Sequence, residues 1–122
     1  MKMKYSIVPA RAVGDRRITF GAFRTLASMC LFTSVNGICY PNQVTLASVR
    51  GVTQPVIAKH LRQLRKYGYV IDLLPIGKKR RNSFQRGNRY FIPTHAGEEP
   101  PSKEIIKHDY LAINRRPPKV YT

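Results

Sequence analysis

Apolar residues recur at helical intervals between Thr19 and Gly68, in three segments that glycines separate. The first segment begins at Thr19, a residue type that favours the N-cap position of a helix. It continues to residues 34–37, where the Asn36-Gly37 pair is typical of a turn. We expect a long amphipathic helix here, and its apolar face consists of Phe23, Leu26, Ala27, Cys30 and Leu31.

The second and third segments predict two further helices joined by a short turn. Asn42 is suited to cap the second helix, and Gly51 is suited to end it. Its mostly buried positions are expected to be Val44, Leu46, Ala47 and Val49. After the turn Gly51-Val52-Thr53, the third helix is capped by Thr53 and ends at Gly68. Its core stripe is Ile57, Leu61 and Leu64, with Pro55 in the first turn, where a missing N–H is tolerated.

Short β-type segments surround these helices. Residues 5–9 predict an extended segment that ends at a proline, and residues 9–15 predict a single turn. Residues 38–40 predict a minimal strand, and residues 69–74 and 89–92 predict two longer ones. The polar, glycine-rich segment 75–88 is then the tip of a β-hairpin. The expected fold class is α+β, mainly α with a small β-hairpin.

The charge of the chain narrows the class of partner. Its 122 residues suit one compact domain, and a hydrophobic fraction of 43% is ordinary for a globular protein. There are 22 lysines and arginines against 6 acids, a net charge of +16. Residues 1–94 hold 17 of these cations and 2 acids, whereas residues 95–122 hold 5 and 4. Such a surface favours a polyanion, because binding releases the counterions condensed on phosphates.

Several short motifs occur in a fixed order along residues 5–71. They are Val8-Pro9, Asp15-Arg16, Tyr40-Pro41-Asn42-Gln43, Leu46-Ala47, Gly51-Val52-Thr53, Ile57, His60-Leu61, Leu64 and Gly68-Tyr69-Val70. With the order helix, strand, helix, turn, helix and hairpin, this region resembles the winged helix-turn-helix DNA-binding domains of plasmid and phage replication proteins and regulators. The resemblance implies binding to double-stranded DNA and says little about which process is controlled.

The outward face of the third helix is the expected DNA-reading surface. Since Ile57, Leu61 and Leu64 face inward, the remaining positions face a groove or solvent. A glutamine there can pair with adenine, a lysine or arginine with guanine or phosphate, and small apolar groups can touch a thymine methyl. The alternative is an ordinary solvated helix face. The predicted recognition residues are Thr53, Gln54, Pro55, Val56, Ala58, Lys59, Arg62 and Gln63.

Two further groups are expected to contact the DNA backbone. Asn42 and Gln43 stand at the N-terminus of the second helix, where backbone N–H groups favour phosphate. The hairpin supplies cations without an intervening acid, which suits a wing lying along phosphates or reaching into a minor groove. These wing residues are Lys78, Lys79, Arg80, Arg81, Arg86 and Arg89.

Residues 1–93 are expected to form the DNA-binding domain, and residues 94–122 a linker and tail with a possible short helix over 105–113. The tail either folds back on the domain, takes part in a homodimer, or orders only with a partner. Several copies on repeated sites are the other arrangement that the sequence leaves open.

Catalysis, metal binding and membrane insertion have no sequence support. His60, His95 and His108 are scattered, and Cys30 and Cys39 lack the spacing of zinc ligands. We therefore expect no enzyme activity, no cofactor, no metal and no small-molecule ligand. No apolar stretch is long enough for a bilayer, and two cysteines imply no disulfide framework. We expect a cytoplasmic protein located on bacterial nucleoid or plasmid DNA.

The sequence thus favours a sequence-specific DNA-binding protein, most simply a plasmid- or phage-type transcriptional repressor that occupies an operator. Plasmid segregation or stability would use the same chemistry. The alternatives are the DNA-binding part of a replication initiator, or a basic structural or RNA-binding protein without sequence specificity.

Overall fold

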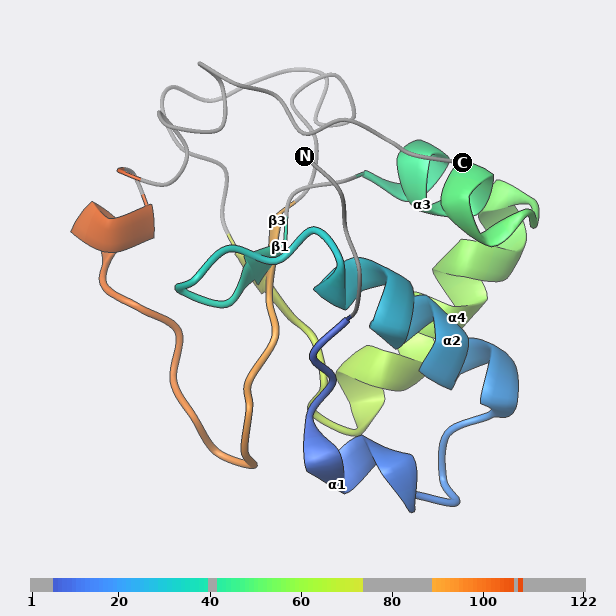
Figure 1. Cartoon of the computed structure of the whole chain (residues 1–122), viewed down its shortest axis with the longest axis horizontal. Coiled ribbons are helices and arrows are strands. Elements are labelled where there is room, and N and C mark those ends of the chain that lie inside the picture. Colours follow the sequence, from blue (N-terminus) through green and yellow to red (C-terminus); the bar gives the residue numbers. More distant parts are fainter. Residues whose placement is uncertain (1–5, 40–41, 74–88, 107, 109–122) are drawn as a thin grey trace.

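The computed structural model describes residues 6–39, 42–73, 89–106 and 108. In this part of the chain, helices pack together on one side and a small antiparallel sheet lies beside them (Figure 1). The elements in chain order are α1 (Ala10–Val13), α2 (Phe20–Cys30), β1 (Ile38–Cys39), α3 (Gln43–Arg50), α4 (Gln54–Lys66), β2 (Ile71–Leu73) and β3 (Arg89–Phe91). The predicted α+β class, mainly α, is confirmed.

Helices α2, α3 and α4 begin directly after the residues that the sequence predicts as their N-caps. Thr19 Oγ1 accepts a hydrogen bond from the backbone N–H of Ala22 at 3.1 Å, and Asn42 Oδ1 accepts one from Thr45 at 2.9 Å. Thr53 also occupies the N-cap position of α4, but its side chain makes no capping hydrogen bond. The expected position of this cap is therefore right, and the expected side-chain bond is wrong.

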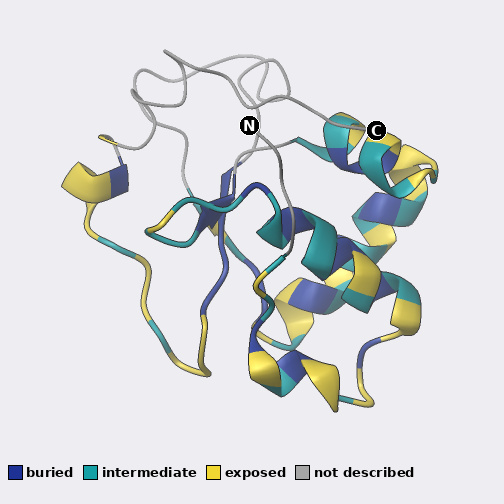
Figure 2. Ribbon diagram, viewed as in Figure 1, coloured by how far each residue is buried: buried dark blue, intermediate teal, exposed yellow. Residues whose placement is uncertain are grey.

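The buried face of α2 differs from the predicted one. The structure buries Ala22, Thr25, Leu26 and Met29. Of the predicted face only Leu26 is among them, whereas the other four residues are half-buried. The reason is that α2 carries apolar residues around most of its circumference, and α3 and α4 both pack against its 22–26–29 side (Figure 2).

The core stripe of α4 is as predicted, because Ile57, Leu61 and Leu64 are all fully buried. On α3, Leu46 and Ala47 are buried, but Val44 is 54% exposed, so its predicted burial is wrong. Val44 lies in the first turn of α3 and is not part of the main core cluster. Helices α2, α3 and α4 each contact the other two and together enclose the main core.

The sheet has the order β1-β3-β2, with both pairs antiparallel. Phe91 lies opposite Ile38 on one side and Ile71 on the other. Tyr90 and Phe91 are buried, so they serve the strand and the core and are not exposed platforms on which bases could stack. The two predicted hairpin strands are thus confirmed, whereas the expected tip, residues 75–88, lies outside the described residues.

The segment after β3 returns to the domain. Ile106 is only 9% exposed and packs with Ile38 of β1 and Leu73 of β2 in a second, small apolar cluster. Residues 103–106 form one helical turn, while the expected continuation of this helix to residue 113 falls outside the described part. Of the arrangements left open for the tail, this contact favours folding back on the domain.

Candidate nucleic-acid interface

A tight turn sets the angle between α3 and α4. Gly51 has a φ of 71°, a left-handed conformation that glycine adopts without strain. Immediately after it, the N–H of Val52 donates to the carbonyl of Ala47 at 3.0 Å, and the Val52 side chain packs against the core. The turn therefore fixes the direction of α4 relative to α3, as a helix-turn-helix requires.

The outward face of α4 presents polar and small side chains. Gln54, Pro55, Lys59 and Arg62 are exposed, and Val56 and Ala58 are half-buried. Within the described ranges, Lys59 and Arg62 have no hydrogen-bond or ion-pair partner in the protein. The first turns of both α3 and α4 lack acids, so no carboxylate opposes an approaching phosphate there.

Gln63 makes a hydrogen bond to another part of the protein, which its position in the sequence did not indicate. Its Oε1 accepts a hydrogen bond from the backbone N–H of Thr19 at 2.6 Å, so it ties α4 to the start of α2. A two-bond contact with adenine, which uses both the oxygen and the NH₂ group of the amide, would require breaking this bond. We therefore describe Gln63 as a residue that positions α4, and the face available to DNA is narrower than predicted.

The start of α3 places Asn42 and Gln43 at half-buried positions. The Oδ1 atom of Asn42 is occupied by its cap bond to Thr45, which leaves its amide NH₂ as the group free to donate to a phosphate. Beside them, the exposed Val44 adds an apolar group that periodicity alone had assigned to the core.

The structure corrects one predicted wing residue. Arg89 is 6% exposed and lies inside the sheet, opposite Leu73, so its guanidinium is not displayed to solvent as a backbone contact requires. A polar residue in a three-residue strand can point either way, and its neighbours decide which. The remaining predicted wing residues lie outside the described part of the chain; they are Lys78, Lys79, Arg80, Arg81 and Arg86.

A polar cluster beneath α4 was not predicted. Thr25 of α2 is fully buried, and its Oγ1 lies 2.7 Å from Nδ1 of His60 on α4. Arg50 of α3 donates through Nε to the same oxygen at 3.0 Å and through Nη2 to the carbonyl of Gly21 at 3.3 Å. Burial and the cations Arg50 and Lys59 lower the pKa of His60. One hydroxyl thus joins all three helices of the helix-turn-helix.

Two arginines near the N-terminus are held by the fold. Arg11 donates to the carbonyl of Gly68 at 2.8 Å and stacks 4.1 Å from the ring centroid of Tyr69. Arg17 pairs with Asp15 at 2.7 Å, and this arginine, followed by the hydroxyl of Tyr69, holds the pKa of Asp15 well below its usual range. These contacts make both arginines poor candidates for extending the DNA surface.

Metal-binding groups are dispersed in the described residues, where no three histidines, cysteines or acids come together. Burial raises the pKa of the Cys30 thiol to about 12, and that of the buried Cys39 is raised as well, so neither thiol is inclined to ionise. In the same part of the chain, no helix combines the length and apolar character needed to span a membrane.

Three packed helices, a glycine turn before the last one and an adjoining antiparallel sheet define a winged helix-turn-helix. Residues 16–70 match the family model of a helix-turn-helix domain, a stretch that contains α2, β1, α3 and α4. No curated protein and no solved structure gives a significant match. Helix-turn-helix domains are a DNA-binding class and typically have no enzymatic activity, which makes DNA the expected partner.

Proposed function

We propose that this protein binds specific double-stranded DNA sites and represses transcription by occupying an operator of plasmid or phage type. Residues 1–93 would supply the DNA-binding domain, and residues 94–122 a linker and tail that returns to the sheet through Ile106. Blocking polymerase access is the simplest mechanism that DNA binding alone can provide.

The observation that carries the proposal is that the side chains of Lys59 and Arg62 are exposed and, among the described residues, unpaired. Both side chains are exposed on α4, opposite its buried stripe, and neither is paired within the described part of the protein. Two unpaired cations three residues apart project along one side of a helix, the arrangement that suits base edges and phosphates in a major groove. Their charges are not already neutralised, so binding DNA does not first require breaking an ion pair.

Charge explains affinity more readily than specificity. A net charge of +16 supports binding to any duplex, whereas the α4 face offers only a few groups that distinguish bases. We therefore expect much of the binding energy to come from backbone contacts at α3 and the hairpin. Specificity would come from Gln54, Lys59 and Arg62, reinforced by the occupation of more than one site.

The test begins with selection of binding sites from a random duplex pool, followed by titration of the selected duplex and a scrambled version. At about 0.2 M salt the non-specific component is weakened, and we expect the selected duplex to bind at least about a thousandfold more tightly. Equal affinities for both would contradict sequence-specific regulation and favour a structural or RNA-binding role.

Repression needs a second measurement. A reporter gene with the selected site overlapping its promoter should be repressed when the protein is expressed, whereas the same site placed well upstream should not. Repression at both positions would exclude simple occupancy. Specific binding without repression at either position would leave DNA recognition intact and move the function toward replication or segregation.

A further inference from the structure

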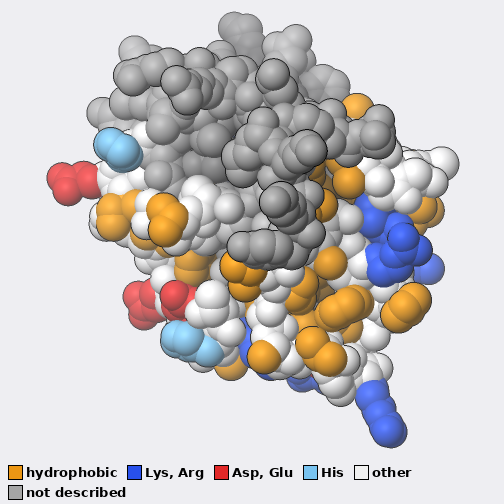
Figure 3. Space-filling view, in the orientation of Figure 1, with side chains coloured by type: hydrophobic (Ala, Val, Ile, Leu, Met, Phe, Trp, Pro, Cys, Tyr) orange, Lys and Arg blue, Asp and Glu red, His pale blue; other side chains and the backbone are white. Residues whose placement is uncertain are grey.

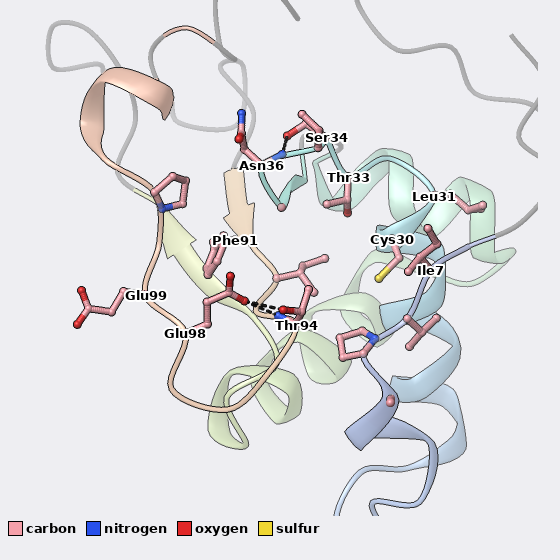
Figure 4. Close-up of a pocket in the computed structure, with 17 residues that line it drawn as sticks. Ile7, Cys30, Leu31, Thr33, Ser34, Asn36, Phe91, Thr94, Glu98 and Glu99 are labelled. Atoms are coloured by element: carbon pink, nitrogen blue, oxygen red, sulfur yellow. Dashed lines mark hydrogen bonds between the residues drawn. The ribbon is translucent and has the colours of Figure 1, made fainter.

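A cleft lies on the side of the molecule where the sheet and the N-terminal segment meet. It has a volume of about 1000 Å³ and is bounded by residues 7–10, the end of α2, the 33–37 turn, the end of β3 and residues 94–101. Much of its wall is apolar, with Ile7 and Leu31 on one side and Phe91 on the other (Figure 4). No face of α4 contributes to it, so it is separate from the proposed DNA surface.

Two acids stand at this cleft. Glu98 lies among the lining residues, and its Oε1 accepts hydrogen bonds from the backbone N–H and the hydroxyl of Thr94, at 2.7 and 2.9 Å. Glu99 also lines the cleft, but its carboxylate points outward from the rim rather than into the cleft (Figure 4). Hydrogen bonds from Thr94 lower the pKa of Glu98, which keeps it ionised.

The carboxylates of Glu98 and Glu99 differ from those of Asp15 and Asp72 in having no arginine partner within the part of the chain that the structure describes. Asp15 is paired with Arg17, and Asp72 with Arg65, whereas neither Glu98 nor Glu99 has a cation within ion-pairing distance in the described residues. In a protein with a net charge of +16, an unpaired acidic site beside an apolar cleft attracts a segment that is both cationic and apolar.

Exposed side chains of that complementary kind occur between the end of α1 and the first half of α2. We define the α2 corner as Val13, Arg16, Phe20 and Arg24. Val13 and Phe20 are 74% and 79% exposed, unusually high for large apolar side chains, and both arginines are exposed. Among the described residues, neither Arg16 nor Arg24 makes an ion pair.

The two surfaces point in different directions. Cys30 and Leu31, at the end of α2, line the cleft, and Phe20 begins the same helix, so about 16 Å of helix separates them. Figure 3 shows acidic side chains at one edge of the molecule, over the segment after β3, and lysine and arginine side chains toward the opposite edge. A molecule cannot fill its own cleft with its own corner, but a second copy can.

We propose that copies of this protein associate head to tail, with the α2 corner of one copy seated in the acidic cleft of the next. Such a heterologous contact leaves one corner and one cleft free at the ends, so it can continue along a row of copies. Both surfaces are small, so the contact is weak in free solution. On DNA with adjacent sites the high effective concentration strengthens it, which provides cooperative occupation of repeated sites.

The test uses sedimentation velocity on the DNA-free protein at rising concentration, so it does not depend on the proposed function. We expect the average mass of the unaltered chain to rise with concentration beyond a dimer. The cleft variant Glu98→Lys/Glu99→Lys and the corner variant Phe20→Glu/Arg24→Glu should each remain monomeric alone. Mixed together, they should form a dimer that grows no further, because each supplies the surface that the other lacks.

Controls separate this contact from general charge effects. Glu104→Lys makes the same type of charge change at an exposed residue outside the cleft and should associate like the unaltered chain. Circular dichroism checks folding, and if a double variant is misfolded, the milder Glu99→Gln and Phe20→Ala replace it. Glu99→Gln should weaken association by up to about fivefold, as expected for loss of an exposed charge pair, and Phe20→Ala by about tenfold, as expected for loss of an aromatic anchor.

Three results would overturn the proposal. The unaltered chain can remain monomeric at every concentration, which would show that the α2 corner of one copy does not bind the cleft of another. The two monomeric variants can fail to dimerise when mixed, which would exclude a head-to-tail contact. Glu104→Lys can abolish association as fully as the cleft variant. Affinity for a duplex with one site is measured separately, and its loss would affect only the DNA proposal.

Discussion

The buried hydroxyl of Thr25 and the imidazole of His60 are joined across the α2–α4 boundary by a contact of 2.7 Å. Because Arg50 donates a hydrogen bond to the same oxygen, the Thr25 O–H proton is free to point toward Nδ1 of His60. When the hydroxyl donates in this way, the imidazole is neutral and carries its proton on Nε2. The contact ties the orientation of α4, and hence of its DNA-facing side, to a buried hydroxyl shared by a histidine and an arginine.

The first prediction concerns Thr25→Val, which nearly preserves shape and removes the hydroxyl. His60 Nδ1 and Arg50 Nε then lose a shared partner at a buried position, which should lower the free energy of unfolding by about 1–3 kcal/mol. Urea denaturation measures this value. Thr45→Val is the control, because the Thr45 hydroxyl makes no hydrogen bond in the described structure; we expect a change within about 0.5 kcal/mol. Equal losses in the two variants would show that the Thr25 hydroxyl is unimportant.

The second prediction concerns pH. Burial, followed by Arg50 and Lys59, lowers the pKa of His60 in the folded protein below the 6.5 of an ordinary histidine. As pH falls through about 6.5, the unfolded chain takes up a proton that the folded chain does not. The folded state is therefore fully favoured above this value and loses stability as the pH falls below it.

His60→Gln should flatten the dependence of unfolding free energy on pH between about 7 and 5. The lowered pKa values of Asp15 and Glu98 affect the free energy of unfolding at more acidic pH, near and below about 4, where these hydrogen-bonded carboxylates become protonated. The two effects are separable by denaturation at closely spaced pH values. Stability that increases from pH 7 to 5 would mean that the imidazolium of His60 is favoured by folding, contrary to its surroundings.

The third prediction concerns Gly21, which lies against the ring of His60. A Cβ added to Gly21 would stand 2.8 Å from Nε2 and 3.0 Å from Cε1 of that ring. Gly→Ala inside a helix normally stabilises it by about 1 kcal/mol. Here the ring is held by its bond to Thr25 and cannot move aside freely. Gly21→Ala should therefore destabilise the protein, by about 1–3 kcal/mol.

Gly14→Ala is the matched control, since a Cβ there meets nothing within 4 Å. Its φ of −104° is accessible to alanine, so this variant should be neutral or more stable by up to about 1 kcal/mol. Thermal melts of both variants check the pair. If Gly21→Ala raised the melting temperature, the His60 ring would have to be free to move.

The helix-turn-helix could be predicted because its signals are local. The spacing of Ile57, Leu61 and Leu64 defines one narrow stripe, and Asn42 and Gly51 mark the two ends of α3 through their own conformational preferences. Each of these features depends on residues within a few positions. The fold class therefore follows from patterns that need no knowledge of distant contacts.

The errors occur where distant neighbours decide. Apolar residues surround most of α2, so periodicity alone could not show that α3 and α4 cover the side of Ala22 and Met29. Gln63 looked like a residue for bases until its bond to Thr19, 44 positions away, was seen. Arg89 likewise belongs to a charged run in the sequence but lies inside the sheet in the structure.

The fourth prediction tests whether the segment after β3 is part of the folded unit. Ile106 packs with Ile38 and Leu73, whereas its neighbour Ile105 is 42% exposed. Ile106→Ala should lower the free energy of unfolding by about 2 kcal/mol, the lower end for a buried isoleucine. Ile105→Ala should change it by no more than about 0.5 kcal/mol. Equal small effects in urea denaturation would show that residues 94–106 fold independently of the sheet.

The last prediction distinguishes base reading from phosphate binding on α4. Lys59→Ala and Arg62→Ala should each weaken binding to the selected duplex by about 1–3 kcal/mol where a base is read. Arg65→Ala removes the same charge as Arg62→Ala from the same helix, but its guanidinium is paired with Asp72 at 2.8 Å. Its effect should therefore be smaller and similar on selected and scrambled duplexes.

Salt dependence supplies the second readout for this set. Loss of a phosphate contact lowers the slope of log affinity against log salt by about one and weakens all duplexes alike, whereas loss of a base contact leaves the slope nearly unchanged. We expect the first behaviour for Lys79→Ala in the hairpin and the second for at least one of Lys59→Ala and Arg62→Ala. The reverse pattern would assign sequence reading to the hairpin. In that case base recognition would not need a free cation on α4, and the unpaired state of Lys59 and Arg62 would no longer support a role for α4 in reading the sequence.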